Sequence, residues 1–222
     1  NDNNAYTIVV DDNTVSASDL NTIDSATSVV VNVLQATKII GDISDVNTAY
    51  ASDGISGLGT ENVDVTHSSS VADLNTLDGT TTGVITAAVT ETDAATLRTL
   101  ANANTNNTYD ITVEDLTVAA SDLNTIDAAT SVVVDVATAE TITGDIADIN
   151  TAYASAGITG LGAEDVIVSD PASVPDLNTL DGTTTGIITA SVSETDAEKL
   201  RDLNNANSNN AYSITVENVS VD

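Results

Sequence analysis

The chain of 222 residues carries 34 acidic side chains against four basic ones, which gives a formal net charge of -30. This balance excludes nucleic-acid binding, which needs a basic surface, and it disfavours contact with anionic membranes. The sequence contains no cysteine and no run of 18 apolar residues, so it predicts neither a disulfide framework nor membrane insertion.

Short helices are predicted where apolar residues recur at helical spacing behind a residue that can cap a helix. The clearest are 42–50 and 94–101, which begin at or just after an aspartate. Pro175 fits the first turn of a further helix, where proline is tolerated. In chain order, the marked helix starts are Ser18, Asp42, 91–93, Ser121, Asp145 and 194–196.

Strands are predicted where β-branched residues cluster between Gly, Asn and Ser. In chain order these runs are 28–33, 83–89, 109–114, 116–118, 131–136, 141–143, 166–169 and 213–217. The chain has no Phe, Trp or Met, so its core must consist mainly of small aliphatic side chains. Such side chains suit thin, regular layers better than one large globular core.

An internal repeat organises these elements. Residues 1–119 align with residues 104–222 at a constant offset of 103, without a gap. The phrase DLNTLDGTTTG, at 73–83 and again at 176–186, illustrates the match. Within each long repeat, the apolar residue that leads a helical segment recurs every 23 to 28 residues, so one coil contains roughly 26 residues.

These periods predict an α/β repeat solenoid. Parallel strands of successive coils would pair with one another, short helices would cover another face, and the stack would form an elongated rod. We expect one continuous solenoid, made of the tail of a preceding repeat (1–16), a first long repeat of four coils (17–118) and a second (119–222). A doubly wound α/β domain is the globular alternative, but it does not account for the constant offset.

Four aspartates stand at the end of a helical segment in equivalent coils, namely Asp24, Asp78, Asp127 and Asp181. An acid at this end of a helix opposes the helix dipole, so its recurrence needs a cause. One hypothesis is a metal site for calcium, in which these carboxylates are joined by the hydroxyls of 80–82 and their counterparts. The alternative, which we favour, is an Asx turn, in which the Asp78 carboxylate accepts the backbone N–H groups that follow it.

Asparagine recurs at one position in three of the four coils of each long repeat: Asn21, Asn47, Asn75, Asn124, Asn150 and Asn178. A polar stripe of this kind could bind a ligand. We favour a ladder that satisfies backbone groups of neighbouring coils, because buried amides need hydrogen-bond partners. Arg98 and Arg201 take the position in the fourth coil, and we expect them to pair with nearby acids.

No set of residues indicates an enzyme. Pairs of carboxylates occur by chance in so acidic a chain, and the single histidine, His67, is replaced by Asp170 in the second repeat. Motifs for a nucleophilic serine, a catalytic zinc or a phosphate-binding loop do not occur. A carbohydrate-active solenoid, with acids clustered in one coil only, is the least favoured alternative.

Tandem units with LNTLDGTTTG and phrases such as TITGDIADINTAYASAGITGLG resemble repeats of giant, acidic, secreted or cell-surface proteins of marine bacteria, of the cyanobacterial adhesin or surface-layer type. The resemblance covers essentially the whole chain. It implies a segment of a longer extracellular or cell-surface protein with a structural role, as a filament, cell coat or adhesin stalk.

The partners expected from this resemblance are neighbouring repeats of the same chain or head-to-tail copies. The alternative function is a calcium-dependent adhesin module that binds glycans or another surface. Calcium is the one cofactor that the sequence suggests, and no catalytic residue follows from the resemblance.

Overall fold

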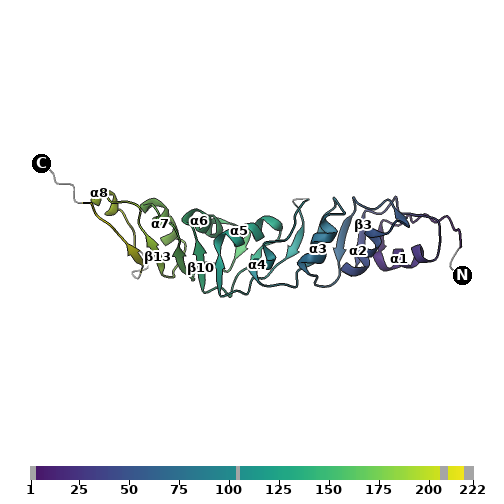
Figure 1. Cartoon of the computed structure of the whole chain (residues 1–222), viewed down its shortest axis with the longest axis horizontal. Coiled ribbons are helices and arrows are strands. Elements are labelled where there is room, and N and C mark those ends of the chain that lie inside the picture. Colours follow the sequence, from purple (N-terminus) through teal and green to yellow (C-terminus); the bar gives the residue numbers. More distant parts are fainter. Residues whose placement is uncertain (1–3, 104–105, 206–209, 218–222) are drawn as a thin grey trace. The chain divides into compact units, whose positions relative to one another are not determined.

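The computed structural model describes residues 4–103, 106–205 and 210–217. It is an α/β protein in which short parallel strands alternate with short helices along the chain (Figure 1). This much of the predicted fold class is confirmed.

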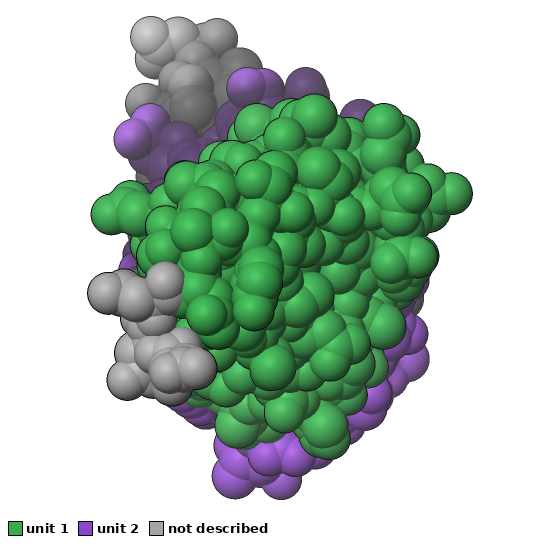
Figure 2. Space-filling view, turned by 90° about the vertical axis from the view of Figure 1, so that its right-hand side faces the viewer, with its two compact units in different colours: residues 1–92, 99–111, 128–132 green, residues 93–98, 112–127, 133–222 purple. Residues whose placement is uncertain are grey.

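The chain divides into two compact units, coloured in Figure 2. Unit 1 consists of Asn1–Thr92, Thr99–Ile111 and Ala128–Val132, and unit 2 of Asp93–Arg98, Thr112–Asp127 and Val133–Asp222. Their limits interleave, whereas the predicted repeats meet at 118/119. The repeat boundary is a property of the sequence period, and it stays a prediction.

Unit 1 contains a sheet of five parallel strands whose neighbours follow in chain order. The strands are β1 (Thr14–Ser16), β3 (Lys38–Gly41), β5 (Asn62–Val65), β6 (Ile85–Ala88) and β7 (Thr108–Asp110). A second sheet pairs β2 (Val31–Asn32) with β4 (Ile55–Ser56), also in parallel. Each coil therefore adds one strand next to that of the coil before it.

Unit 2 repeats this arrangement with another sheet of five parallel strands. The strands are β8 (Thr117–Ala119), β10 (Thr141–Gly144), β12 (Asp165–Val168), β13 (Ile188–Ser191) and β14 (Ala211–Ser213). Its two-stranded sheet pairs β9 (Val134–Asp135) with β11 (Ile158–Thr159). The 103-residue period of the sequence thus reappears as the same strand order in both units.

The helix starts keep the predicted spacing of roughly 26 residues, whereas the strand registers advance by fewer. Thr14 pairs with Lys38, and Lys38 with Asn62, which are steps of 24 residues. Thr86 pairs with Thr108, a step of 22 residues. The predicted mean of roughly 26 residues came from the helical segments, and these drift relative to the strands because the connections between strand and helix differ in length.

Eight short helices occur in the described part of the chain. They are α1 (Ala17–Ser25), α2 (Ile43–Ala51), α3 (Val71–Asp78), α4 (Ala94–Leu97), α5 (Ala120–Ala129), α6 (Ile146–Ala154), α7 (Val174–Asp181) and α8 (Ala197–Leu200). Helix α1 follows β1 directly, α2 follows β3 after Asp42 alone, and α3 follows β5 after 66–70. This variation accounts for the drift between the strand and helix periods.

Local capping chemistry sets most helix starts. The predicted caps Asp42 and Asp145 precede α2 and α6, and Pro175 lies in the first turn of α7. The predicted helix start at Ser18 is one residue late, because α1 begins at Ala17. Helix α1 begins earlier because Ser16, the last residue of β1, already accepts the N–H of Asp19 at 3.3 Å. Helix α5 also begins one residue before Ser121, at Ala120.

The predicted helix at 94–101 is wrong in its length, because α4 ends at Leu97 after one turn. The N–H of Ala101, which a longer helix would bond to the carbonyl of Leu97, donates instead to Asn75 Oδ1 at 2.7 Å. A contact with a neighbouring coil therefore ends this helix.

Three predicted strands are shorter than expected and two are displaced. Residues 28–33 contain only β2, residues 83–89 only β6 and residues 131–136 only β9, while β7 lies at Thr108–Asp110 and not at the predicted 109–114. Strand β14 lies at Ala211–Ser213, ahead of the predicted 213–217. Strands β1, β3 and β5 were not predicted, because segments such as TVS and NVDV are too short to give a β-branched run.

The core of each sheet contains a row of aliphatic side chains from successive strands. In unit 1 the row is Val15, Ile39, Val63 and Ile85, each at most 6% exposed. Helices α1, α2 and α3 add Leu20, Val46 and Leu74, all fully buried. Each buried aliphatic side chain contributes about 1.5–3 kcal/mol, so these side chains supply much of the favourable free energy of folding.

Candidate functional site

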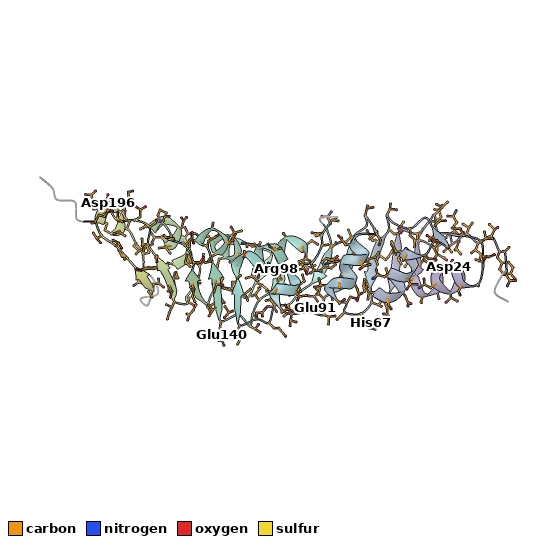
Figure 3. All side chains as sticks on the ribbon, in the orientation of Figure 1. Asp24, His67, Glu91, Arg98, Glu140 and Asp196 are labelled. Carbon is orange, nitrogen blue, oxygen red and sulfur yellow. The ribbon has the colours of Figure 1, made fainter. Side chains whose placement is uncertain are left out.

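Two of the four predicted metal ligands, Asp24 and Asp127, bond to the next coil. Ser52 donates to Asp24 Oδ2 at 2.7 Å, and Ser155 donates to Asp127 Oδ2 at 2.7 Å. Figure 3 labels Asp24 on its helix. A Cβ atom at Gly54 would lie only 1.9 Å from Asp24 Oδ1, so the carboxylate occupies space that a glycine leaves. These acids therefore connect coils.

The other two predicted ligands, Asp78 and Asp181, are almost fully buried, with 3% and 4% exposed. Asp78 accepts the N–H of Ala103 at 2.9 Å and the side-chain amide of Asn107 at 2.7 Å. Asp181 accepts the side-chain amide of Asn210 at 2.6 Å. The same buried contact between an acid and an amide thus occurs in both repeats.

Asn107 is fully buried, and both the nitrogen and the oxygen of its side-chain amide are hydrogen-bonded. Its Nδ2 donates to Asp78 and also to Tyr109 Oη at 3.0 Å, while its Oδ1 accepts the N–H of Ile85 at 2.9 Å. Sequence reasoning missed this residue, since Asn107 lies 29 positions after the aspartate it binds. The signal was available, because Asn210 and Tyr212 repeat Asn107 and Tyr109 at the 103-residue offset.

The Asx-turn interpretation of Asp78 is wrong. The N–H groups of Thr80 and Thr81 donate to the carbonyl of Leu77 at 2.9 and 3.3 Å, and the N–H of Gly79 donates to the carbonyl of Asn75 at 3.3 Å. The turn is therefore made by helix carbonyls, which leaves the carboxylate available for the neighbouring coil.

The three threonines after this turn also bond to backbone carbonyls. Thr80 donates to Leu77 at 2.8 Å, Thr81 to Glu61 at 3.2 Å and Thr82 to Gly59 at 3.1 Å. Thr81 Oγ1 also accepts the N–H of Gly83 at 3.0 Å. The run TTT therefore closes one coil onto the coil before it.

In the part of the chain that the structure describes, no three His, Cys, Asp or Glu side chains are grouped to hold a metal ion. The oxygens of Asp78 point at N–H donors, and a cation would have to displace those donors to reach them. The predicted calcium site at Asp24, Asp78, Asp127 and Asp181 stays a prediction, for which Asp78 offers a direct test.

Two buried carboxylates were not predicted at all. Glu61 and Glu164 are 2% and 5% exposed. Glu61 accepts the N–H of Gly59 at 2.7 Å and that of Thr60 at 2.9 Å. Gly59 has a φ of 122°, a left-handed conformation that suits glycine and turns these N–H groups toward one point. The Glu61 carboxylate thus occupies a concavity of N–H groups of the kind that binds anions. In the sequence, the repeated phrase GLGxE marks both of these glutamates.

The asparagine ladder is confirmed. Each of the six predicted asparagines donates its side-chain amide to a backbone carbonyl of the following coil, over 2.8 to 3.3 Å. The pairs are Asn21–Asp45, Asn47–Asp73, Asn75–Thr99, Asn124–Asp148, Asn150–Asp176 and Asn178–Asp202. The stripe therefore satisfies main-chain carbonyls between coils, while Asn47 Oδ1 and Asn150 Oδ1 are buried without a hydrogen-bond partner.

The expected pairing of the arginines is also confirmed. Arg98 lies 3.6 Å from Asp122, and Arg201 lies 3.6 Å from Asp202. Lys38 on β3 contacts Asp64 on the neighbouring β5 at 2.6 Å. These contacts neutralise a few of the 34 acids and leave most of the repulsion in place.

We therefore expect the unfolding midpoint to rise when sodium chloride is raised from low to marine ionic strength, because salt screens repulsion among exposed carboxylates. Chemical denaturation at several salt concentrations measures this. A midpoint that falls or stays flat would contradict the prediction.

His67 contacts Asp42 across neighbouring coils, although both side chains are largely exposed. Hydrogen bonds from Thr66 and then His67 lower the pKa of the Asp42 carboxyl below its ordinary value. In the second repeat Asp170 stands at the histidine position and accepts the N–H of Ile146 at 3.0 Å. Either residue supports the start of a helix, so the histidine has a structural counterpart.

Four tyrosines lie beside buried acids. Burial, and next the charges of Glu61, Asp78 and Glu164, raise the pKa of Tyr50, Tyr109 and Tyr153 above its ordinary value. The same causes, with Asp181 as the charge, raise the pKa of Tyr212 to about 12. The folded state therefore holds these phenol protons more tightly than the unfolded state does.

The raised tyrosine pKa values predict that the free energy of unfolding falls at high pH. Because the tyrosine pKa values are raised in the folded state, the contribution of these tyrosines to the free energy of unfolding is fully present below the ordinary tyrosine pKa of about 10. It is lost as the pH rises above that value. Denaturation at pH 8, 10 and 11 should show a falling free energy of unfolding, and Tyr109→Phe should reduce the slope. A constant free energy over this range would contradict the expectation.

Comparisons with protein-family models, with curated proteins and with solved structures give no match for this chain. None of the described helices is long and apolar enough to cross a membrane. Any functional conclusion therefore depends on the geometry of the coils and on the chemistry of their side chains.

Proposed function

We propose that this chain is a structural segment of a long extracellular repeat protein, in which coils stack into a solenoid that serves as a filament, cell coat or adhesin stalk. The solenoid acts as a spacer whose length is set by the number of repeats. Its partners are further repeats of the same kind.

The observation that carries this proposal is the use of the candidate-site residues. The predicted aspartates and the asparagine stripe are all bonded to a neighbouring coil in both repeats. A binding or catalytic site normally keeps polar groups available to a ligand, and it differs from its surroundings. Here the most conspicuous polar groups hold the coils together.

The parallel sheets support the same function. In each unit the strands are neighbours in chain order, so a further coil adds to a sheet without rearranging the rest. A strand at the end of such a sheet presents N–H and C=O groups to another strand. Chains built in this way lengthen by duplication, which suits a spacer.

Small-angle X-ray scattering on chains of increasing length tests the proposal. One chain is the protein itself, and others carry one or two additional copies of residues 17–119. A stack predicts a maximum dimension that rises by the same increment for each copy. Globular packing predicts a radius of gyration that grows only with about the 0.38 power of chain length, and that result would contradict the proposal.

The extracellular location needs a separate test. Antibodies raised against the folded chain should label intact cells of the source organism without permeabilisation. Labelling that requires permeabilised cells would contradict the surface location, whatever the scattering shows.

A further inference from the structure

Each coil runs from the start of one helix to the start of the next. In the first repeat the coils are 17–42, 43–70, 71–93 and 94–119, and the second repeat has the same helix starts at an offset of 103 residues. We number the four coils of a repeat in this order and call the contact between two successive coils a junction. The asparagine ladder is common to three of the four junctions, but each junction also has contacts of its own.

The junction between the first and second coils depends on an aspartate. The Asp24 carboxylate accepts the hydroxyl of Ser52 at 2.7 Å, and it lies against Gly54, where a Cβ atom would clash with it. The same junction in the second repeat is made by Asp127, Ser155 and Gly157. A first coil therefore fits a successor that has a serine and a glycine at these two places.

The junction between the second and third coils depends on main-chain atoms. The carbonyl of Glu61 accepts the hydroxyl of Thr81 at 3.2 Å, and the same carbonyl approaches Gly83 so closely that no Cβ atom fits there. The same junction in the second repeat is made by Glu164, Thr184 and Gly186. A second coil therefore fits a successor that has a threonine followed two residues later by a glycine.

The junction between the third and fourth coils is the buried contact of an acid with an amide. Asp78 accepts the side-chain amide of Asn107 at 2.7 Å and the N–H of Ala103 at 2.9 Å. Asp181 and Asn210 repeat the contact of the acid with the amide at 2.6 Å. A third coil therefore fits a successor that supplies a buried amide.

The junction between a fourth coil and the first coil after it depends on a threonine. The Thr130 hydroxyl donates to the carbonyl of Tyr109 at 2.8 Å and accepts the N–H of the same tyrosine at 2.9 Å. Thr27 makes both bonds to Tyr6, at 2.9 and 3.0 Å. All four junctions thus occur twice, each time with the same residue types.

One helix position shows that these contacts cannot be interchanged. The residue four positions after the buried residue that leads each helix is Asp24, Tyr50, Asp78 and Ala101 in the four coils. Only the first and third coils therefore have an acid there, and these two acids bind different partners, a serine and an asparagine.

We propose that the junctions fix the order of the coils. Each coil accepts one type of successor, so the whole repeat of four coils is the smallest piece by which the chain can lengthen. This inference rests on the proposed function as a stack of coils, and it names the partner that each coil surface recognises.

A wrong successor would leave buried groups without partners. A third coil followed by any coil other than the fourth would leave Asp78, which is only 3% exposed, without the amide of Asn107. A second coil followed by another second coil would place Tyr50 against Ser52 and Gly54 of the successor, where Asp24 normally lies. Buried unpaired carboxylates and steric overlap both destabilise the folded state.

Two insertions into the full chain test the proposal. One variant carries a second copy of 43–145 after Asp145, which keeps the order of the coils. The matched variant carries the same insertion with the segments 71–93 and 94–119 exchanged, so that length, composition and charge are identical. In urea denaturation the ordered variant should unfold in one transition, with a midpoint at or above that of the original chain.

The exchanged variant should unfold at a lower urea concentration and in more than one transition, because three of its junctions join the wrong coils. Equal midpoints for the two variants would overturn the proposal. Failure of the ordered variant to fold would overturn it as well, since an insertion that preserves every junction should be accepted.

A single junction can be tested by reversing its residues. Asp78→Asn and Asn107→Asp should each lower the unfolding midpoint, and the double variant should recover at least half of the loss, because a carboxylate then faces an amide again. The control combines Asn107→Asp with Asp110→Asn, which keeps the net charge but changes an exposed aspartate, and it should recover nothing. Losses that simply add in the double variant would overturn specific recognition at this junction.

The outcomes separate this inference from the proposed function. If both insertions fold equally well and lengthen the chain equally in scattering, the fixed order is overturned and the spacer function stands. If the ordered variant alone folds but does not extend the maximum dimension, the fixed order is supported and the spacer function is contradicted.

Discussion

Replacing Gly83 with alanine is expected to lower the free energy of unfolding by about 3 kcal/mol or more, because the new methyl group has no space. A Cβ atom at this position would lie 2.0 Å from the carbonyl oxygen of Glu61 and 2.8 Å from the backbone nitrogen of Asn62. Both are main-chain atoms, so the two coils would have to separate. Urea denaturation of the purified variant measures the loss.

Gly79, in the same DGTTTG phrase, supplies the matched control. It caps α3 with a φ of -71°, which any residue adopts, and a Cβ there would meet nothing closer than 3.6 Å. Gly79→Ala should therefore be neutral or slightly stabilising. If both variants lose the same stability, the close approach at Gly83 is not the cause.

Asp78→Asn should cost about 3 kcal/mol, since it removes a buried charged acceptor and places an amide against N–H donors. The affected donors are the N–H of Ala103 and the side chain of Asn107. Asp110→Asn removes the same charge from an exposed position and should cost little. Thermal and urea denaturation of the two variants measures the difference.

The same variant decides the calcium hypothesis. A hydrogen-bonding role for Asp78 predicts an equal loss of stability in chelator and in millimolar calcium. A calcium site predicts that wild-type stability rises with calcium, and that the difference between wild type and variant appears only when calcium is present. That second pattern would restore the metal site.

Local chemistry accounts for what could be predicted from the sequence. Asp145 precedes α6 and its side chain accepts the first-turn N–H of Asp148, whereas Asp42 precedes α2 without such a bond. Pro175 lies where a helix has no N–H to lose. The asparagine ladder followed from the rule that buried amides need partners. These inferences need only neighbouring residues and one period.

The errors have a common cause, which is pairing between coils. Strands β1, β3 and β5 contain three or four residues each, and they are strands because a neighbouring strand lies beside them. Helix α4 stops at Leu97 because Asn75 binds Ala101. Neither fact can be read from a short window of sequence, because the deciding partner lies 22 to 26 residues away.

The candidate site shows the same limit. The sequence identified Asp78 and Asp181 as recurring acids at the end of a helical segment, and both are almost fully buried in the structure. It did not indicate the partners Asn107 and Asn210, because the choice between turn, metal and cross-coil contact depends on what the next coil supplies. An offset alignment that includes polar residues, and not only apolar ones, would have suggested these pairs.

The cross-coil bonds have a consequence for folding kinetics. The side-chain bonds described above span between 20 and 29 residues, from Thr81–Glu61 to Asp78–Asn107. Loops of that size close quickly, and their entropy does not grow when more coils are added. A chain several times longer should therefore fold at a similar rate per coil, starting at any coil and spreading to its neighbours as it emerges from the ribosome.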